Sequence, residues 1–380
     1  MKLTVNKDQL NGSIQQVSKA ISSRTAIPIL SGIKIEANEQ GITLTASDTD
    51  ISIQSTIPPH QGDVELFTLE QEGAVVLPAK FFVDIIRKLP EDSVEIEVKD
   101  GFQTMIRSGL SEIQLVGMDA EEYPVLPSLD AKETVLMQSD LLKTMIRQTI
   151  LAVSTHESTP ILTGVLFTIQ DEQIKLTATD RHRLATREAS IRNEEGTQFK
   201  NIVISGKNLN ELQKLLPDQD TLIEVIRADN QVLFNLGSVL FFTRVLDGLY
   251  PDTSKIIPQA YKTEMVVPAK PFLSAMDRVN LLSREERTNI VKMATLDDGK
   301  IEISSSSSEL GKITEQLDVP SISGEPLKIS FNSRYMLDAL KTIDSEWIHL
   351  GFTGAMSPII VKPKDETFLL HLILPYRTTG

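Results

Sequence analysis

The sequence contains no cysteine among its 380 residues. This absence excludes disulfide bonds, thiolate metal sites and a cysteine nucleophile, and it fits a reducing cytoplasm. No apolar run reaches the roughly 18 residues that a transmembrane helix needs, and the N-terminus turns polar too early for a signal peptide. We therefore expect a cytoplasmic protein that does not bind a membrane, with two to four domains of roughly 100–200 residues each.

Motifs that mark common catalytic and cofactor sites are also missing. The sequence has no phosphate-binding or dinucleotide-binding glycine loop, no zinc-protease helix motif, no serine elbow and no calcium loop. Its five histidines show no metal-ligand spacing. In Thr179-Asp180-Arg181-His182-Arg183-Leu184 a carboxylate and an imidazole follow a predicted strand, as in some acid–base sites. Because no nucleophile motif accompanies this cluster, we interpret it as a binding loop and predict no enzyme activity, no cofactor and no metal.

The sequence does contain an internal repeat of about 130 residues. PILSGI at 28–33 recurs as PILTGV at 160–165, and ITLTASD at 42–48 recurs as IKLTATD at 174–180. A weaker third copy occupies residues 288–319. Units of this length are domains, because solenoid repeats have periods of about 20–50 residues.

Each repeat divides into two halves of about 60 residues, each with the order strand, helix, three strands. Pro90 and Pro217 follow two of the predicted helices, where a proline commonly ends a helix. The sequence therefore predicts an α+β protein of three tandem, structurally similar domains, each with two βαβββ halves, at residues 1–130, 131–258 and 259–380.

The net charge of −14 is distributed unevenly. Six predicted helices carry fifteen basic and six acidic residues, a net charge of +9, so the rest of the chain carries −23. These helices are 7–24, 79–89, 139–154, 206–216, 269–284 and 333–343. Basic stripes usually only solvate a helix, but six positive helices in an acidic chain favour a surface that holds a polyanion and repels it elsewhere.

Three of these helices repeat one spacing, in which a cation, an acid and a cation lie at positions 0, +4 and +7. About 100° of rotation per residue places such positions on one stripe of a helix. The stripes are Lys80–Asp84–Arg87, Lys207–Glu211–Lys214 and Arg334–Asp338–Lys341. In the first helix Phe81, Phe82 and Ile85 are predicted to form the opposite, apolar face that packs on the sheets.

Short motifs spread along the whole chain match one known family. They are Arg24 with Pro28-Ile29-Leu30, Leu77-Pro78-Ala79, Arg107-Ser108-Gly109, Thr177-Ala178-Thr179-Asp180 with His182-Arg183-Leu184, Asp247-Gly248 with Tyr250-Pro251, and Leu374-Pro375-Tyr376-Arg377. Through them the sequence resembles the bacterial sliding clamps, the β subunits of DNA polymerase III. The resemblance implies a DNA-replication processivity factor, a head-to-tail homodimeric ring of six domains around duplex DNA. It also implies a cleft for short peptides of DNA polymerases, the clamp loader and repair proteins.

The charge pattern and the resemblance give three sets of candidate residues. Candidates for non-sequence-specific contact with double-stranded DNA are Arg24, Lys80, Arg87, Arg147, His156, Lys207, Lys214, Arg278, Arg334 and Lys341. Candidates for the peptide-binding cleft are Leu162, Thr179, His182, Arg183, Leu184, Pro251, Ile256, Leu372, Ile373, Leu374, Pro375, Tyr376 and Arg377. Candidates for the dimer interface are Ile113, Leu115, Leu281 and Leu282. Arg181 and Lys255 depart from residues common in the family, which leaves the finer peptide preference open.

A second hypothesis is a repeat-built cytoplasmic enzyme or carbohydrate-binding protein, in which the stripes are only solvated faces. An aromatic content of 5% and a single tryptophan, Trp347, weaken the case for sugar stacking. The two hypotheses differ in topology, because a ring stays on circular DNA and slides off a linear copy.

Overall fold

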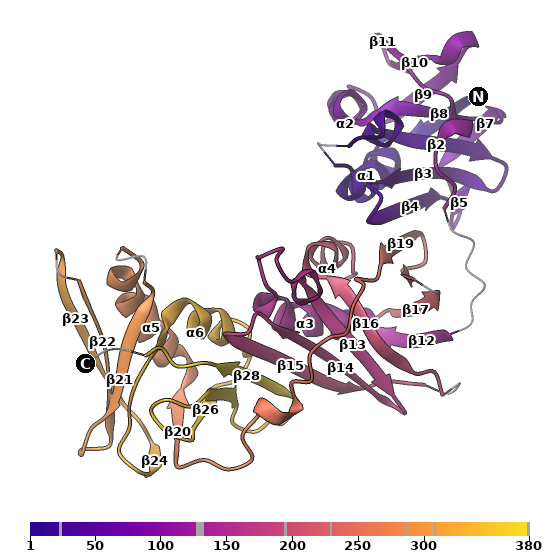
Figure 1. The fold of residues 1–380 in the computed structure, drawn as a ribbon. Helices are drawn as coiled ribbons and strands as arrows, with labels where there is room; N and C mark the ends of the chain where they lie inside the picture. Colours follow the sequence, from indigo (N-terminus) through magenta and orange to yellow (C-terminus); the bar gives the residue numbers. More distant parts are fainter. Residues whose placement is uncertain are drawn as a thin grey trace. The chain divides into compact units, whose positions relative to one another are not determined.

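The computed structural model comprises two compact units, one of residues 1–140 with 214–245 and the other of residues 141–213 with 246–380 (Figure 1). The structure describes residues 1–22, 25–126, 133–193, 196–228, 230–285, 288–307 and 309–377. None of the helices in these ranges combines the length and the hydropathy of a membrane span.

The first repeat consists of two βαβββ halves, which confirms the predicted fold class. Its first half runs through β1 (Lys2–Asn6), α1 (Lys7–Val17), β2 (Gly32–Asn38), β3 (Gly41–Ser47) and β4 (Ile51–Ile57). Its second half runs through β8 (Gly73–Pro78), α2 (Ala79–Lys88), β9 (Ser93–Val98), β10 (Gln103–Ser108) and β11 (Ser111–Val116). Between the halves lie β5 (His60–Gln61), β6 (Val64–Glu65) and β7 (Phe67–Gln71). Short 3₁₀ turns are η1 (Ser18–Ala20), η2 (Pro28–Ser31), η3 (Asp100–Phe102) and η4 (Ala120–Glu122).

The first unit contains a five-stranded and an eight-stranded antiparallel sheet. The smaller has the order β11-β10-β9-β1-β7. The larger has the order β12-β17-β18-β19-β4-β3-β2-β8, with β12 (Glu133–Gln138), β17 (Leu222–Ala228), β18 (Gln231–Asn235) and β19 (Val239–Arg244). Its two halves join where β4 pairs with β19 and the fully buried Ile53 lies opposite Phe241. The side chain of Asn6 caps helix α1, which begins at Lys7, and the buried residues Leu10 and Ile14 share one face of the helix.

The second unit contains the middle repeat without its strands β12, β17, β18 and β19, and the whole third repeat. The middle repeat contributes α3 (Ser139–Thr149), η5 (Ile150–Ala152), η6 (Pro160–Thr163), β13 (Gly164–Gln170), β14 (Gln173–Thr179), β15 (Arg183–Ser190), β16 (Phe199–Ser205), α4 (Gly206–Gln213) and η7 (Ser254–Ile256). The third repeat contributes β20 (Thr263–Pro268), α5 (Ala269–Glu285), β21 (Ile290–Thr295), β22 (Lys300–Ser307), β23 (Gly311–Asp318), β24 (Ser321–Gly324), β25 (Lys328–Asn332), α6 (Ser333–Leu340), β26 (Trp347–Phe352), β27 (Ile359–Pro363) and β28 (Leu369–Ile373).

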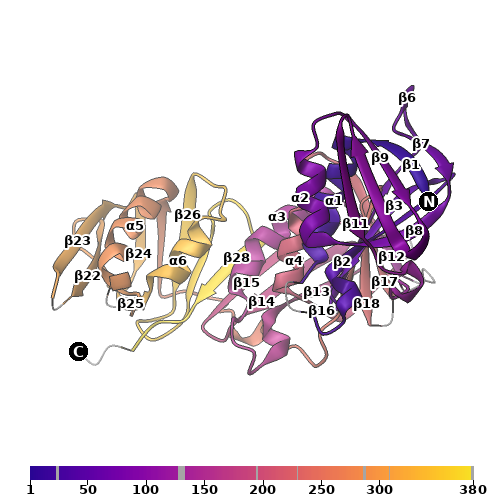
Figure 2. The same ribbon diagram turned by 90° about the horizontal axis from the view of Figure 1, so that it is seen from above.

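Two antiparallel sheets organise this unit as well. The nine-stranded sheet has the order β16-β13-β14-β15-β28-β27-β26-β20-β24, and its two halves join where Leu184 on β15 lies opposite Leu372 on β28. The four-stranded sheet has the order β23-β22-β21-β25. Helices α5 and α6 lie side by side, and α5 packs on β22 and β23 (Figure 2). Buried residues of these helices and sheets, among them Phe272, Phe331 and Phe352, form one core.

Except for α5 (Ala269–Glu285), the helices are shorter than predicted at their C-terminal ends. α1 tightens into η1 and the chain becomes extended at Ile21, whereas the sequence predicted helix as far as residue 24. α3 likewise passes into η5 before Val153, and α4 and α6 each end three residues early. Leu216 precedes a proline, and this position disfavours the helical backbone. The predicted stripes therefore begin on a helix, but Lys214 and Lys341 lie just beyond the helix ends.

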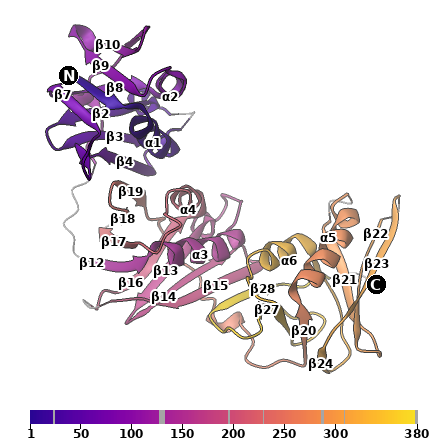
Figure 3. The same cartoon turned by 180° about the vertical axis from the view of Figure 1, so that it is seen from behind.

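The middle repeat is divided between the two units. Its strands β17, β18 and β19 belong to the sheet of the first repeat, and its strands β13 to β16 belong to a sheet of the third repeat (Figures 1 and 3). The predicted boundary at residue 130 lies outside the described residues. The division into domains 1–130, 131–258 and 259–380 therefore stays a prediction.

Candidate functional site

The turn between β14 and β15 is organised by the carboxylate of Asp180. One carboxylate oxygen accepts hydrogen bonds from the backbone N–H groups of His182 and Arg183, both at 2.9 Å. The Thr179 hydroxyl donates to the carbonyl of Arg183 at 2.7 Å, and it accepts from the N–H of Arg181 at 3.2 Å. Side chains of Asp and Thr stabilise tight turns in this way. Asp180 therefore holds the turn together and contacts the backbone of His182, not its imidazole, which supports a binding loop rather than an acid–base pair.

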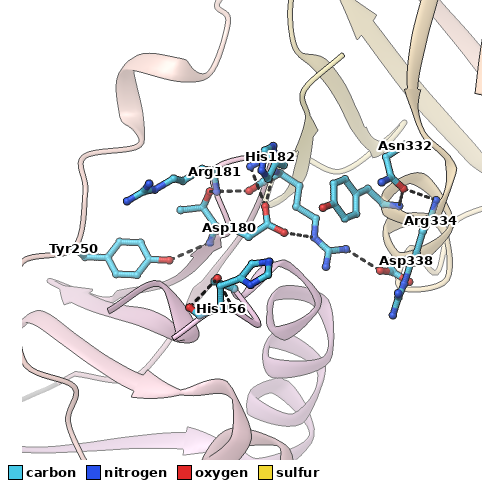
Figure 4. Close-up of polar contacts among 12 residues, drawn as sticks. His156, Asp180, Arg181, His182, Tyr250, Asn332, Arg334 and Asp338 are labelled. Carbon is cyan, nitrogen blue, oxygen red and sulfur yellow. Dashed lines mark hydrogen bonds and ion pairs between the residues drawn. The ribbon is translucent and has the colours of Figure 1, made fainter. Parts of the chain in front are cut away.

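Arg183 connects this turn to helix α6. Its guanidinium donates to Asp180 at 3.0 Å and to Asp338 at 2.7 Å, and it lies 4.3 Å from the ring centre of Tyr335 (Figure 4). Only 12% of the Arg183 side chain is exposed. The side chain of Asn332 caps α6, accepting from the N–H groups of Arg334 and Tyr335. Because two carboxylates neutralise Arg183, it anchors the turn and has little charge left for a ligand.

Hydrogen bonds bring three further segments to this turn. The Tyr250 hydroxyl accepts from the N–H of Thr179 at 3.0 Å (Figure 4), and burial raises the pKa of this phenol. The N–H of Leu374, just after β28, donates to the carbonyl of His182 at 2.9 Å. Arg181 donates from its guanidinium to the Thr159 hydroxyl at 3.2 Å, directly before η6. The loop before β13, the loop after β19 and the C-terminal strand thus meet at one turn.

The residues predicted for the cleft fall into two groups by exposure. Five are buried and belong to the core beneath this surface: Leu162, Thr179, Leu184, Leu372 and Ile373. Six are exposed: His182, Pro251, Ile256, Leu374, Tyr376 and Arg377. Arg183 and Pro375 are half-buried. The exposed group includes apolar side chains that are 46% (Ile256), 38% (Leu374) and 53% (Tyr376) exposed, which gives this surface an apolar character.

His371 on β28 lies in the core beneath the same turn. Its Nε2 is 3.2 Å from the Thr342 hydroxyl, and its Nδ1 has no hydrogen-bond partner in the described part of the chain. Burial, together with the positive charge of Arg183, lowers the pKa of His371 to about 3. An unfolded histidine binds a proton below about pH 6.5, so the unfolded state binds more protons between these two values. Stability therefore falls as the pH decreases from about 6.5 towards 3.

We expect this histidine to make the unfolding free energy pH-dependent. On going from pH 7 to pH 5, His371 should account for a loss of about 2 kcal/mol. The His371→Gln variant, whose amide can still reach the Thr342 hydroxyl, should lose that much less over the same interval. Urea unfolding of both proteins at the two pH values measures this difference. If the unfolding free energies of the two proteins changed by the same amount between these pH values, His371 would not be held neutral in the folded protein.

The candidate DNA-binding residues that the structure describes in the first unit are exposed. Arg87 forms an ion pair with Asp84 along α2, and the Lys80 ammonium lies 5.8 Å from the ring centre of Phe81. The prediction that Phe81 packs on the sheets was wrong, because its side chain is 56% exposed. Phe81 lies beside Lys80 on the helix, so the buried face of α2 is narrower and contains Phe82 and Ile86. Lys214 is also exposed, and Arg24 lies outside the described residues.

In the second unit, carboxylates accompany several of the predicted cations. Arg147 forms an ion pair with Asp344. Glu315 accepts two hydrogen bonds from Arg278, at 2.9 and 2.8 Å, and these bonds raise the pKa of the arginine. Lys341 lies 3.8 Å from Asp277. Arg334, Lys207 and His156 are exposed. Sequence reasoning did not identify the acidic partners Asp344 and Glu315, because they come from other elements of the fold.

The four residues predicted for the dimer interface lie on two elements. These are β11, the last strand of the first repeat, and α5, the first helix of the third repeat. Ile113 and Leu115 are half-buried and alternate with exposed residues along β11, which is an edge strand. Leu281 on α5 is 54% exposed, and Leu282 beside it is half-buried. A second edge strand, β23, packs on the same helix α5. The sequence analysis missed β23, although it is the last strand of its half, as β11 is.

Within the described ranges, no group of three or more His, Asp or Glu side chains is arranged to hold a metal ion.

Comparison with known sequences gives a match along almost the entire chain. The N-terminal domain of the DNA polymerase III beta subunit matches residues 1–127, its central domain matches residues 136–252 and its C-terminal domain matches residues 254–377. The "Beta sliding clamp" of Bacillus subtilis is 50% identical over 379 residues, and that of Halalkalibacterium halodurans is 47% identical over 379 residues. Both alignments cover 100% of each chain.

Solved structures give the same result. The DNA polymerase sliding clamp of Bacillus subtilis is similar with a TM-score of 0.97 and 49% identity, covering 100% of this chain and 99% of that one. The DNA polymerase III beta chain of Streptococcus pneumoniae is similar with a TM-score of 0.95 and 34% identity, covering 99% of this chain and 100% of that one.

Proposed function

Because the chain belongs to the family of DNA polymerase III beta subunits and is a DNA sliding clamp, we propose that two copies close head to tail around duplex DNA. The ring tethers the replicative polymerase and has no catalytic chemistry of its own. It works in the cytoplasm. Family membership replaces the alternative of a repeat-built enzyme or carbohydrate-binding protein.

The observation that carries the ring proposal is the way in which half-repeats pair their last strands. β4 pairs antiparallel with β19, and β15 pairs antiparallel with β28. Among the last strands of the half-repeats, β11 and β23 are the two that the described part of the chain leaves at sheet edges. Unpaired edges accept a further strand. If β11 of one copy pairs with β23 of the next, the contact is head-to-tail, and two copies close it cyclically.

The DNA contacts follow from the exposed cations of the helices. Long flexible Lys and Arg side chains bind phosphates without reading the base sequence. The carboxylates beside Arg87, Arg147, Arg278 and Lys341 reduce the local positive potential. Such a surface binds DNA weakly, which suits a ring that must slide along the duplex.

The peptide cleft is proposed at the turn between β14 and β15. Exposed Ile256, Leu374 and Tyr376 provide apolar area for a hydrophobic anchor of the peptide. The hydrogen-bonded turn is rigid enough to present these side chains without prior ordering. DNA polymerases, the clamp loader and repair proteins are the proposed partners, and they compete because they share one surface.

DNA topology provides the test of the ring. Clamps assembled on a nicked circular plasmid should remain bound during gel filtration at physiological salt. Cutting the plasmid once should release them, because only encirclement depends on the absence of ends. Restriction of a second plasmid without a bound clamp controls for the enzyme itself. Equal retention on circular and linear DNA would contradict the proposal.

A further inference from the structure

Arg181 occupies an unusual backbone conformation in the turn between β14 and β15. Its φ is +74°, in the left-handed region that glycine adopts without strain and that other residues seldom adopt. Its side chain is exposed and points away from Asp338 and helix α6 (Figure 4). The hydrogen bond to the Thr159 hydroxyl holds its guanidinium towards the start of η6.

Arg181 and its neighbour Arg183 differ in the carboxylates that lie near their guanidinium groups. Arg183 is neutralised by Asp180 and Asp338. In the described part of the chain, no carboxylate lies within ion-pair distance of Arg181. The turn therefore presents one guanidinium that forms no ion pair with a carboxylate of the described chain.

The position of Arg181 also relates it to the proposed peptide surface. The preceding strand ends at Thr179, whose N–H binds Tyr250, the residue before the exposed Pro251. The residue after Arg181, His182, binds exposed Leu374 through its carbonyl. A peptide that binds over Pro251 and Leu374 would thus pass Arg181, which lies between these two contacts.

We propose that Arg181 is a specificity-determining residue, which selects partner peptides with Asp or Glu next to their apolar anchor. The inference rests on the peptide cleft proposed above. A carboxylate of the peptide would form the ion pair with Arg181 that no carboxylate of the described chain forms. Electrostatic complementarity of this kind gives specificity and speeds association, and salt weakens it because the site is exposed.

The experiment compares two labelled ten-residue peptides that share a Leu-Phe anchor. One has two Asp residues before the anchor, and the other has two Asn residues. Fluorescence anisotropy on the full-length clamp at low salt should show about three- to tenfold tighter binding of the Asp peptide. In Arg181→Gln this preference should vanish, and in Arg181→Lys most of it should remain. Raising the salt to about 0.5 M should reduce the preference of the unmodified protein.

Arg192→Gln provides the matched control. Arg192 is exposed and lies just after the other end of β15, so its removal changes the net charge equally. This variant should retain the full preference for the Asp peptide. Equal binding of both peptides by the unmodified clamp, or a preference that survives in Arg181→Gln, would overturn the role of Arg181 alone. If neither peptide binds to any of the proteins, both this inference and the proposed cleft are wrong.

Discussion

Leu281→Asp is expected to abolish dimerisation of the clamp while each copy remains folded. Leu281 is 54% exposed on α5, the helix that packs on edge strand β23. A carboxylate there would be buried without a partner once β11 of another copy paired with β23. An unpaired buried charge costs several kcal/mol, so the dissociation constant of the dimer should rise by about 100-fold or more. Sedimentation velocity across a concentration series measures the change.

Met356→Asp is the matched control for this experiment. Met356 is 55% exposed in the same unit, in the turn between β26 and β27, and it lies on neither proposed edge. This variant should remain dimeric at the same concentrations. At concentrations low enough to dissociate the dimer, both variants should unfold at nearly the midpoint of the unmodified protein, because each substitution replaces a side chain that is already half in solvent. A dimeric Leu281→Asp protein would contradict the assignment of α5 to the interface.

The second large effect is expected for DNA retention after charge reversal at Arg147 and Arg334. These arginines lie on α3 and α6, and the double Glu variant changes four sites in a two-copy ring. Each lost phosphate contact reduces the slope of log affinity against log salt by about 0.9, and the ring would lose about four. The half-life of clamps on circular DNA at physiological salt should fall at least about tenfold.

Two further variants show whether the effect arises at the helices. Lys292→Glu with Lys328→Glu makes the same change of charge on exposed strand residues of β21 and β25, outside the helix stripes, and should leave retention unchanged. Asp344→Asn removes the carboxylate that pairs with Arg147 and should lengthen retention. Equal losses in the helix and strand variants would mean that net charge, not the helix stripes, sets DNA binding.

The parts of this protein that could be predicted from sequence are those governed by short-range periodicity. The recurrence of PIL at residues 28 and 160 identified the repeat, and alternating apolar residues identified the strands on either side of it. The spacing of Lys80, Asp84 and Arg87 correctly predicted one exposed helical stripe. Such patterns depend on the geometry of a single element, which 3.6 residues per helical turn and 2 per strand repeat determine.

The features that sequence reasoning missed depend on contacts between distant residues. Asp344 pairs with Arg147 across 197 positions, so no local pattern relates them. The pairing of β15 with β28 joins separate repeats, and apolar alternation specifies which face of a strand is buried but not its neighbour. Phe81 was misassigned because an apolar residue at the margin of a helical face follows the period equally well whether it is buried or exposed.

The strand pairings that join the repeats have a consequence for how the protein is made. β4 cannot pair until β19 has been synthesised, and β15 cannot pair until β28 has been synthesised. In each pair roughly 180 residues separate the two strands. At about 5–20 residues per second, a ribosome takes about 10 to 40 s to add that length. During this time the nascent chain has an open hydrogen-bonding edge, which another chain can occupy. Crowded polysomes should therefore favour mispaired clamps, and slower initiation of translation should increase the yield of correctly folded protein.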